Sequence, residues 1–282
     1  MADTTDSIGG NAKIVVREPP ELIDQQIHCV TLRAFYADRD DGEGQTDVAV
    51  KMFSLNGSDE DVALIRNRLV REAGIWSRLD HPNILPLLGT CEFADDTHGR
   101  TAWLITQYCS NGNIMQYLTK NPQANRILLL KGVGNALLYL HEEGIIHGDL
   151  RPGIIAVRDN GEAAIYDFGR SKRVGRKGST TYTRGTCRYS APEAWSERST
   201  SDLTEASDVY SFGMIALHII SGITPFLTEP TDAAIQRRVI AGDLPTRQEH
   251  PKVTTAQWRI IEQCWDYKAE NRLGMSEVLL TL

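Results

Sequence analysis

Apolar residues follow a strand-like pattern in the first part of the chain, where short runs of β-branched and aromatic side chains recur between polar segments. Strands are expected at Ile27–Tyr36, Val48–Phe53 and Trp103–Thr106. Between the second and third runs, apolar residues recur at helical spacing after Ser58 and Asp61, which have the pattern of a capping box. We therefore expect one helix from Ser58 to about Leu79 among these strands.

In the later part of the chain, apolar residues recur at the longer spacing that is typical of helices. The clearest expected helices are Leu128–His141, Asp208–Ile220, Ala233–Ile240 and Ala256–Trp265. Gly144 follows the first of them closely, as is usual at the C-terminal end of a helix.

Two short apolar runs, Ile154–Val157 and Ala163–Tyr166, interrupt the helical part. The Asp-Asn-Gly sequence at 159–161 between them favours a tight primed hairpin turn, because these residues tolerate positive φ. The hairpin would bring Asp149 and Asp167 toward one end of the same pair of strands. Two carboxylates that converge beside a glycine suit a divalent metal ion and a phosphate substrate.

This pattern resembles the catalytic centre of the eukaryotic protein kinases, and the tyrosine-kinase-like group fits best. The segment 147–152 is similar to the catalytic loop, and 167–169 to the metal-binding Asp-Phe-Gly triplet. Further motifs follow in the family order: the lysine-bearing strand Val48–Lys51, the activation-segment end Ser190–Glu193, the anchoring helix Asp208–Gly213, and Arg272 as the partner of Glu193.

The resemblance implies an α+β protein-kinase fold with a small β-rich lobe, one regulatory helix and a larger helical lobe. Residues 1–20 would be a flexible tail and 21–282 the kinase-like domain. Within it, the lobes would cover about 21–106 and 114–282, joined by a hinge at about 107–113.

The resemblance also assigns roles to individual residues. Asp149 would accept the proton of the substrate hydroxyl, Asp167 would hold Mg²⁺ between phosphates of ATP, and Arg151 would steady the γ-phosphate. The residues assigned to ATP are Lys51, Glu72, Ala49, the gatekeeper Thr106, Gln107, Cys109 and Ala156. Three of these residues also have a plain alternative: Lys51 as a solvated lysine, Glu72 as a surface glutamate and Asp149 as a helix- or loop-capping aspartate. We expect Lys51 and Glu72 to contact each other if the regulatory helix is held inward.

Three departures from the family pattern concern nucleotide and metal binding. No glycine lies between Ile14 and Asp41, where the family has a glycine-rich loop whose amides approach the phosphates. Ile154 stands where the family has an asparagine that binds the second Mg²⁺, and an apolar side chain cannot ligate a hard cation. Tyr166 replaces a small residue before Asp167 and would either enter the nucleotide space or point into the core.

A basic run from Arg170 to Lys177 precedes a cluster of hydroxyl side chains at 179–183. This segment would be an exposed and mobile activation segment with candidate phosphorylation sites, or simply a solvated loop. Gly148 replaces the arginine that commonly reads a phosphorylated activation segment in the family, a change that concerns regulation.

Composition narrows the possible partners. The net charge of −7 shows no overall excess of basic residues of the kind that binds nucleic acid. The five cysteines form no Cys-x-x-Cys pair, so reduced thiols in the cytoplasm are the simplest interpretation. No apolar window is long enough to span a bilayer, and the first 13 residues do not resemble a signal peptide.

The sequence thus predicts a pseudokinase, a signalling protein with weak or absent binding of ATP and Mg²⁺ that acts on other signalling proteins or a partner kinase. The alternative is an active serine/threonine kinase that retains Lys51, Glu72, Asp149 and Asp167 and uses one Mg²⁺. A third possibility is a nucleotide-sensing switch that binds ATP without turnover.

Overall fold

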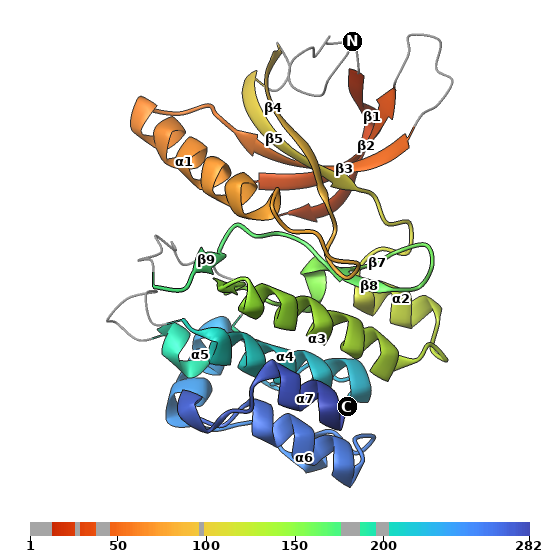
Figure 1. The fold of residues 1–282 in the computed structure, drawn as a ribbon, viewed down its shortest axis with the longest axis vertical. Helices are drawn as coiled ribbons and strands as arrows, with labels where there is room; N and C mark the ends of the chain where they lie inside the picture. Colours follow the sequence, from red (N-terminus) through yellow and green to blue (C-terminus); the bar gives the residue numbers. More distant parts are fainter. Residues whose placement is uncertain (1–12, 26–28, 38–45, 96–98, 176–186, 196–202) are drawn as a thin grey trace. The chain divides into compact units, whose positions relative to one another are not determined.

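The computed structural model describes residues 13–25, 29–37, 46–95, 99–175, 187–195 and 203–282, which form two compact units (Figure 1). The first unit comprises Met1–Asp80 and Ile84–Gly112, and the second comprises His81–Asn83 and Asn113–Leu282. The described strands of the first and helices of the second confirm the predicted α+β class.

The first unit contains an antiparallel five-stranded sheet with the strand order β1-β2-β3-β5-β4, and helix α1 follows β3 in the chain. The elements are β1 Lys13–Gln25, β2 Cys29–Ala37, β3 Thr46–Ser54, α1 Asp59–Trp76, β4 Leu87–Asp95 and β5 Gly99–Gln107. Ser58 caps α1 by accepting a hydrogen bond from the Asp61 amide, as its position predicted. The helix ends three residues before the predicted Leu79.

Strand β1 corrects the expected tail, because residues 13–20 belong to it and only 1–12 lie outside the described residues. Its pairing with β2 steps from Val16 opposite Ala34 to Glu21 opposite Arg33. The four residues between, 17–20, interrupt the ladder and include two prolines, which cannot donate a ladder hydrogen bond. The prolines and the charges around them therefore hid the strand from the sequence pattern.

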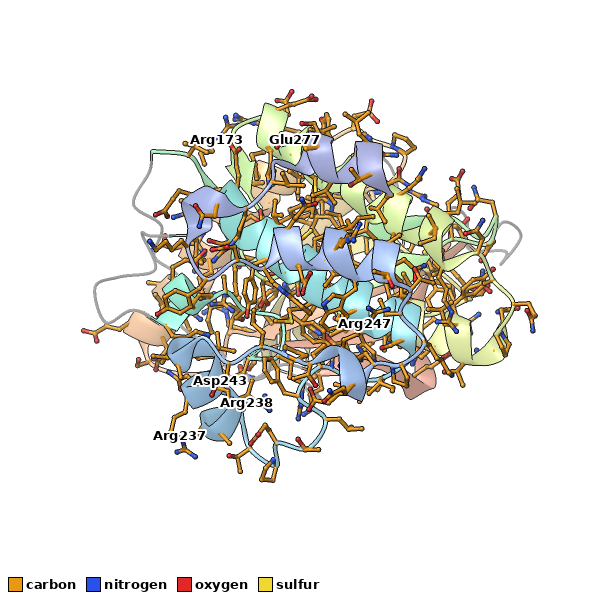
Figure 2. All side chains as sticks on the ribbon, turned by 90° about the horizontal axis from the view of Figure 1, so that it is seen from below. Arg173, Arg237, Arg238, Asp243, Arg247 and Glu277 are labelled. Carbon is orange, nitrogen blue, oxygen red and sulfur yellow. The ribbon has the colours of Figure 1, made fainter. Side chains whose placement is uncertain are left out.

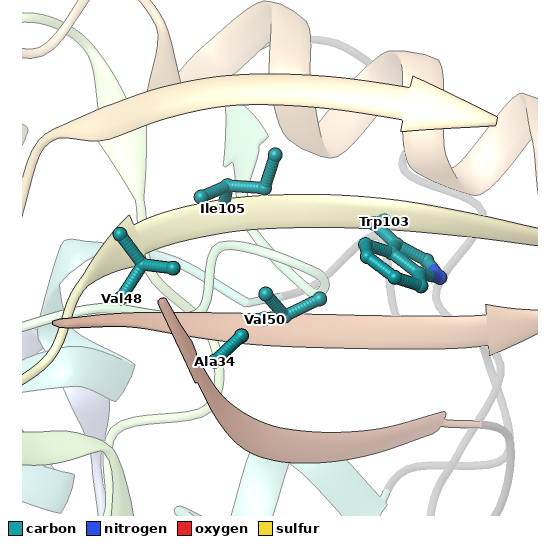
Figure 3. Packing of buried hydrophobic residues seen from close by; sticks show 5 residues of the cluster. All are labelled: Ala34, Val48, Val50, Trp103 and Ile105. Atoms are coloured by element: carbon teal, nitrogen blue, oxygen red, sulfur yellow. The ribbon is translucent and has the colours of Figure 1, made fainter. Parts of the chain in front are cut away.

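Apolar side chains from neighbouring strands form a core in the sheet of the first unit (Figure 3). The five are Ala34, Val48, Val50, Trp103 and Ile105. Val48 and Val50 point to one face of β3 because alternate residues of a strand share a face. Ala49 and Lys51, on the opposite face, are buried too, so β3 is covered on both sides.

The second unit is built around α4 Glu205–Ser221, most of whose residues are buried and which packs against α3 and α6. The other described helices are α2 Ile114–Lys120, α3 Arg126–Glu142, α5 Asp232–Ala241, α6 Thr255–Cys264 and α7 Met275–Thr281. Two small antiparallel pairs complete the unit: β6 Ile145–Ile146 with β9 Lys172–Arg173, and β7 Ile155–Val157 with β8 Ala163–Ile165. The four helices predicted in this region are confirmed to within three residues at either end.

The β7–β8 hairpin is confirmed, but its turn differs from the expected one. Arg158 and Glu162 close a loop of three residues, with the Arg158 amide donating to the Glu162 carbonyl at 2.9 Å. Gly161 has a φ of +85°, whereas Asp159 and Asn160 keep negative φ. This geometry is typical of a three-residue hairpin loop, in which a type I turn is followed by one left-handed glycine. Such a loop is compatible with the twist of the two strands.

No described helix is long and apolar enough to cross a membrane.

Burial in the sheet core predicts a contrast between two valines. Val50 is fully buried in β3, whereas Val70 on α1 is 72% exposed. Val50→Ala should lower the free energy of unfolding by about 2 kcal/mol, because it removes buried methyl groups and leaves a cavity. The same substitution at position 70 should be neutral or slightly stabilising, because alanine favours helix. Urea denaturation of both variants would measure this, and equal losses would contradict the assigned core.

Candidate active site

A buried ion pair joins the sheet to the helix of the first unit. The Lys51 ammonium on β3 lies 2.8 Å from a Glu72 carboxylate oxygen on α1. Both residues are buried, and each charge needs the other because an unpaired buried charge is strongly unfavourable. The predicted contact is confirmed, so α1 is held toward β3.

The other residues assigned to a nucleotide in this unit lie near one end of β3 and β5. Ala49 is the cross-strand partner of Thr106. The Thr106 hydroxyl donates to the Pro86 carbonyl at 2.7 Å, and the Cys109 carbonyl accepts from the Gly112 amide at 3.0 Å. Gln107 is paired with β3 as well. Their roles toward a nucleotide remain predictions.

The segment that would carry the glycine-rich loop joins β1 to β2. It reads Gln-Ile-His at 26–28 and contains no glycine; its conformation lies outside the described residues.

In the second unit, one buried carboxylate fixes the catalytic loop. Asp208, near the start of α4, accepts hydrogen bonds from the His147 and Gly148 amides, each at 2.8 Å. His141 of α3 lies 3.1 Å from the same carboxylate. Burial alone would raise the pKa of Asp208, but the His141 hydrogen bond, the nearby His147 side chain and the Gly148 amide lower the pKa below its ordinary value.

Gly148 suits the backbone that Asp208 imposes. Its φ is +75°, a left-handed conformation that glycine adopts without strain. A Cβ atom at this position would lie 3.2 Å from the Arg170 carbonyl, so glycine also relieves a close approach. The departure from the family arginine thus has a local structural consequence as well as the expected regulatory one.

Asp149 follows this glycine, and its carboxylate lies between two arginines. Arg170 Nη1 donates to Asp149 Oδ1 at 3.0 Å, and Arg151 Nε lies 4.0 Å from Oδ2. Sequence reasoning placed Arg170 only in the basic run and missed this contact. The signal available was its position three residues after Asp167, which the hairpin was expected to bring near Asp149.

Asp167 is buried at the end of β8 and has a φ of +70°, one of two described non-glycine residues with positive φ. Its carboxylate accepts from the Gly169 amide at 3.3 Å. A left-handed aspartate costs conformational energy and is common at functional sites, where surrounding contacts hold it in place. A carboxylate so oriented suits one hard cation that is shared with phosphate oxygens.

The position of the second metal ligand does not fit a metal. Ile154 is 1% exposed, and its backbone carbonyl accepts from the Tyr166 amide at 3.1 Å. Among the described residues, no three His, Cys, Asp or Glu side chains gather closely enough to hold a metal ion. The Ile154 side chain offers no ligand atom, so of these two positions Asp167 is the one that would hold Mg²⁺ together with phosphate oxygens.

Tyr166 is half-buried, and its side chain forms a hydrogen bond within its own unit. Its hydroxyl donates to the Gly153 carbonyl at 3.0 Å. The ring is thereby fixed beside the catalytic loop, immediately before Asp167. Ala156, also assigned to the nucleotide, is buried in β7 opposite Ala164.

A second ion pair, which is half-buried, lies in the described part of the activation segment. Arg272 donates to both carboxylate oxygens of Glu193, at 2.6 and 2.9 Å, which confirms the predicted partnership. Burial would raise the pKa of Glu193, but hydrogen bonds from Arg272 and Ser207 lower it. The predicted phosphorylation sites at 179–183, and Arg176 and Lys177, lie outside the described residues.

The site geometry agrees with a comparison of the whole sequence. Residues 28–282 match the family of protein tyrosine and serine/threonine kinases, and the chain belongs to this family. Its members generally use ATP and Mg²⁺.

Three relatives illustrate the range of the family. The chain is 30% identical to the probable serine/threonine-protein kinase gdt2 of Dictyostelium discoideum over 80% of its length. It is 27% identical to the serine/threonine/tyrosine-protein kinase HT1 of Arabidopsis thaliana and 28% identical to ephrin type-A receptor 5 of Homo sapiens, each over 84% of its length. The match spans 13%, 60% and 22% of these three relatives, respectively.

The Asp208 contacts predict a pH-dependent loss of stability on substitution. Asp208→Asn should lower the free energy of unfolding at neutral pH by about 3–5 kcal/mol, because it removes a buried charge that three groups require. Since the folded-state pKa of Asp208 is lowered, its contribution is complete above its ordinary pKa and is lost as the pH falls through the folded value. The difference between wild type and variant should therefore shrink below about pH 4.

Urea denaturation across this pH range would measure the effect. Asp243, which is exposed and labelled in Figure 2, provides the matched control. Asp243→Asn should change stability by less than about 0.5 kcal/mol at every pH. A loss at position 208 that does not vary with pH would contradict the role given to its charge.

Proposed function

We propose that this chain is a pseudokinase, a signalling module of protein-kinase fold in which Mg-ATP binding and phosphoryl transfer are impaired. The observation that carries the proposal is Ile154, a buried apolar side chain at the position of the second metal ligand. Kinase catalysis depends almost entirely on positioning and on electrostatic stabilisation of the phosphates. Loss of one such stabilising group costs about 10²–10³ in rate.

Two further features support the same proposal. The β1–β2 connection has no glycine with which to approach phosphates. Arg170 occupies one oxygen of Asp149, the carboxylate that would accept the substrate proton. A substrate hydroxyl would have to compete with this charge-assisted hydrogen bond, which is stronger than a neutral one.

A pseudokinase acts through contacts with other proteins. The partners we propose are signalling proteins or a partner kinase inside the cell. The names of the relatives, serine/threonine kinases and a receptor, fit a signalling role.

The alternative is an active serine/threonine kinase that uses one Mg²⁺. The specific observation in its favour is the buried pair of Lys51 and Glu72 at 2.8 Å, which phosphoryl transfer in the family requires. This pair also stabilises the first unit by itself, so it is compatible with either function.

Calorimetry with Mg-ATP tests the proposal on the wild type and on variants of the second unit. Wild-type protein should bind Mg-ATP weakly or not at all, with transfer well below the roughly 1–100 s⁻¹ of kinases. Ile154→Asn combined with Tyr166→Ala should improve binding more than either change alone, because both act on the same region.

Tyr166→Phe is the matched control, because it removes only the hydrogen bond to Gly153 and keeps the ring. It should not improve binding. Wild-type protein that binds Mg-ATP at about micromolar concentration and transfers phosphate at ordinary kinase rates would refute the proposal and favour the active kinase.

A further inference from the structure

The carboxylate of Asp149 is flanked by guanidinium groups on both oxygens. Arg170 Nη1 is 3.0 Å from one oxygen, and Arg151 Nε is 4.0 Å from the other. The three side chains are 12–18% exposed, so each reaches the surface of the unit where a ligand could meet it. Arg170 comes from the segment after Asp167 and Arg151 from the catalytic loop, so two separate parts of the chain supply the charge.

The adjacent Gly153 leaves room for one of these groups. A Cβ atom at position 153 would collide with the Arg151 guanidinium. The φ of Gly153 is not in the left-handed region, so the backbone itself does not demand glycine. The absence of a side chain here instead lets Arg151 fold back over residue 153, beside Ile154.

The cluster of Asp149, Arg151 and Arg170 has excess positive charge. It contains one carboxylate and two guanidinium groups, which gives a net charge of +1. By Coulomb's law such a cluster repels a divalent cation and attracts an anion such as a phosphate. Ile154 offers no ligand for a second cation, while the two arginines bring positive charge to Asp149.

We propose that Arg170, together with Arg151, takes the place of the second metal ion and binds the phosphates of a nucleoside triphosphate directly. A guanidinium carries five donors in a planar fork, so it can hold a carboxylate and a phosphate oxygen together. Phosphate recognition then does not depend on Mg²⁺, and ATP binds without metal at least as tightly as with it. This inference rests on the proposed impairment of Mg-ATP binding and specifies the ligand that the chain accepts instead.

The test is calorimetry of the whole chain with ATP in the presence of a chelator, and again with excess Mg²⁺. Arg170→Leu should weaken metal-free ATP binding about 10- to 100-fold, the scale of one hydrogen bond to a charged group. Arg170→Lys keeps the charge but loses the fork, so it should restore only part of the affinity. Adenosine has no phosphates, and its binding should not change in either variant.

Arg173→Leu is the matched control. Arg173 belongs to the same basic run, is exposed on β9, and is labelled in Figure 2. This change removes the same charge three residues away, so ATP affinity should stay within about twofold. Gly153→Ala provides an independent variant that leaves Arg170 in place and displaces the Arg151 guanidinium; it should also weaken metal-free ATP binding.

The outcomes separate this inference from the proposed function. ATP binding that requires Mg²⁺, or that is equally strong in Arg170→Leu, would overturn the inference. No ATP binding under either condition would overturn it too, yet would leave the pseudokinase proposal standing. Rapid phosphoryl transfer by the wild type would refute the pseudokinase instead. Metal-free binding that is lost in Arg170→Leu and kept in Arg173→Leu would support the arginine site.

Discussion

The buried carboxylate of Asp208 is the constraint on which the catalytic loop of the second unit depends. It is held inside α4, and it accepts from two successive loop amides while it pairs with His141 of α3. Three elements thus meet at a single charge, and none of the three can shift without leaving that charge unsatisfied. The left-handed Gly148 and the backbone position of Asp149, the next residue, follow from this arrangement.

The parts that fix geometry are kept in this chain, whereas position 154 and the glycine-free connection of β1 to β2 depart from the family pattern. Asp208 and the pair of Lys51 and Glu72 are buried ionic contacts, and the buried Arg272 pairs with the half-buried Glu193. Loss of one partner from such a contact costs several kcal/mol, about 3–5 in typical cases, so stability alone is enough reason to retain them. Their presence is therefore weak evidence for catalysis, whereas Ile154 bears directly on the chemistry.

Local signals account for most of what the sequence predicted correctly. The cap at Ser58 and the apolar spacing of the helices are determined by residues within one or two turns of each other. The hairpin turn at 159–161 is likewise determined by the backbone preferences of its own Asp-Asn-Gly sequence. The ion pair of Lys51 with Glu72 came from the family resemblance, since the two residues are 21 positions apart. Strand β4, with a bulge after Leu87, and strand β1, with its prolines, have weak local patterns and were missed.

The contact of Arg170 with Asp149 shows a different limit. Whether a long side chain folds back onto a carboxylate depends on the packing of both backbones and on side-chain rotamers. Spacing along the chain carries no such information. The same holds for Gly153, whose role is visible only once the Arg151 guanidinium is placed beside it.

The most direct test of the central claim is a count of metal ions. Mn²⁺ can replace Mg²⁺ as a spin label, and electron paramagnetic resonance in the presence of a non-hydrolysable ATP analogue gives the number bound per protein. A site without the second ligand predicts at most one Mn²⁺ per chain, and Ile154→Asn should add a second. Two Mn²⁺ ions on the wild-type protein would contradict the account, because Ile154 would then not have removed the second metal site.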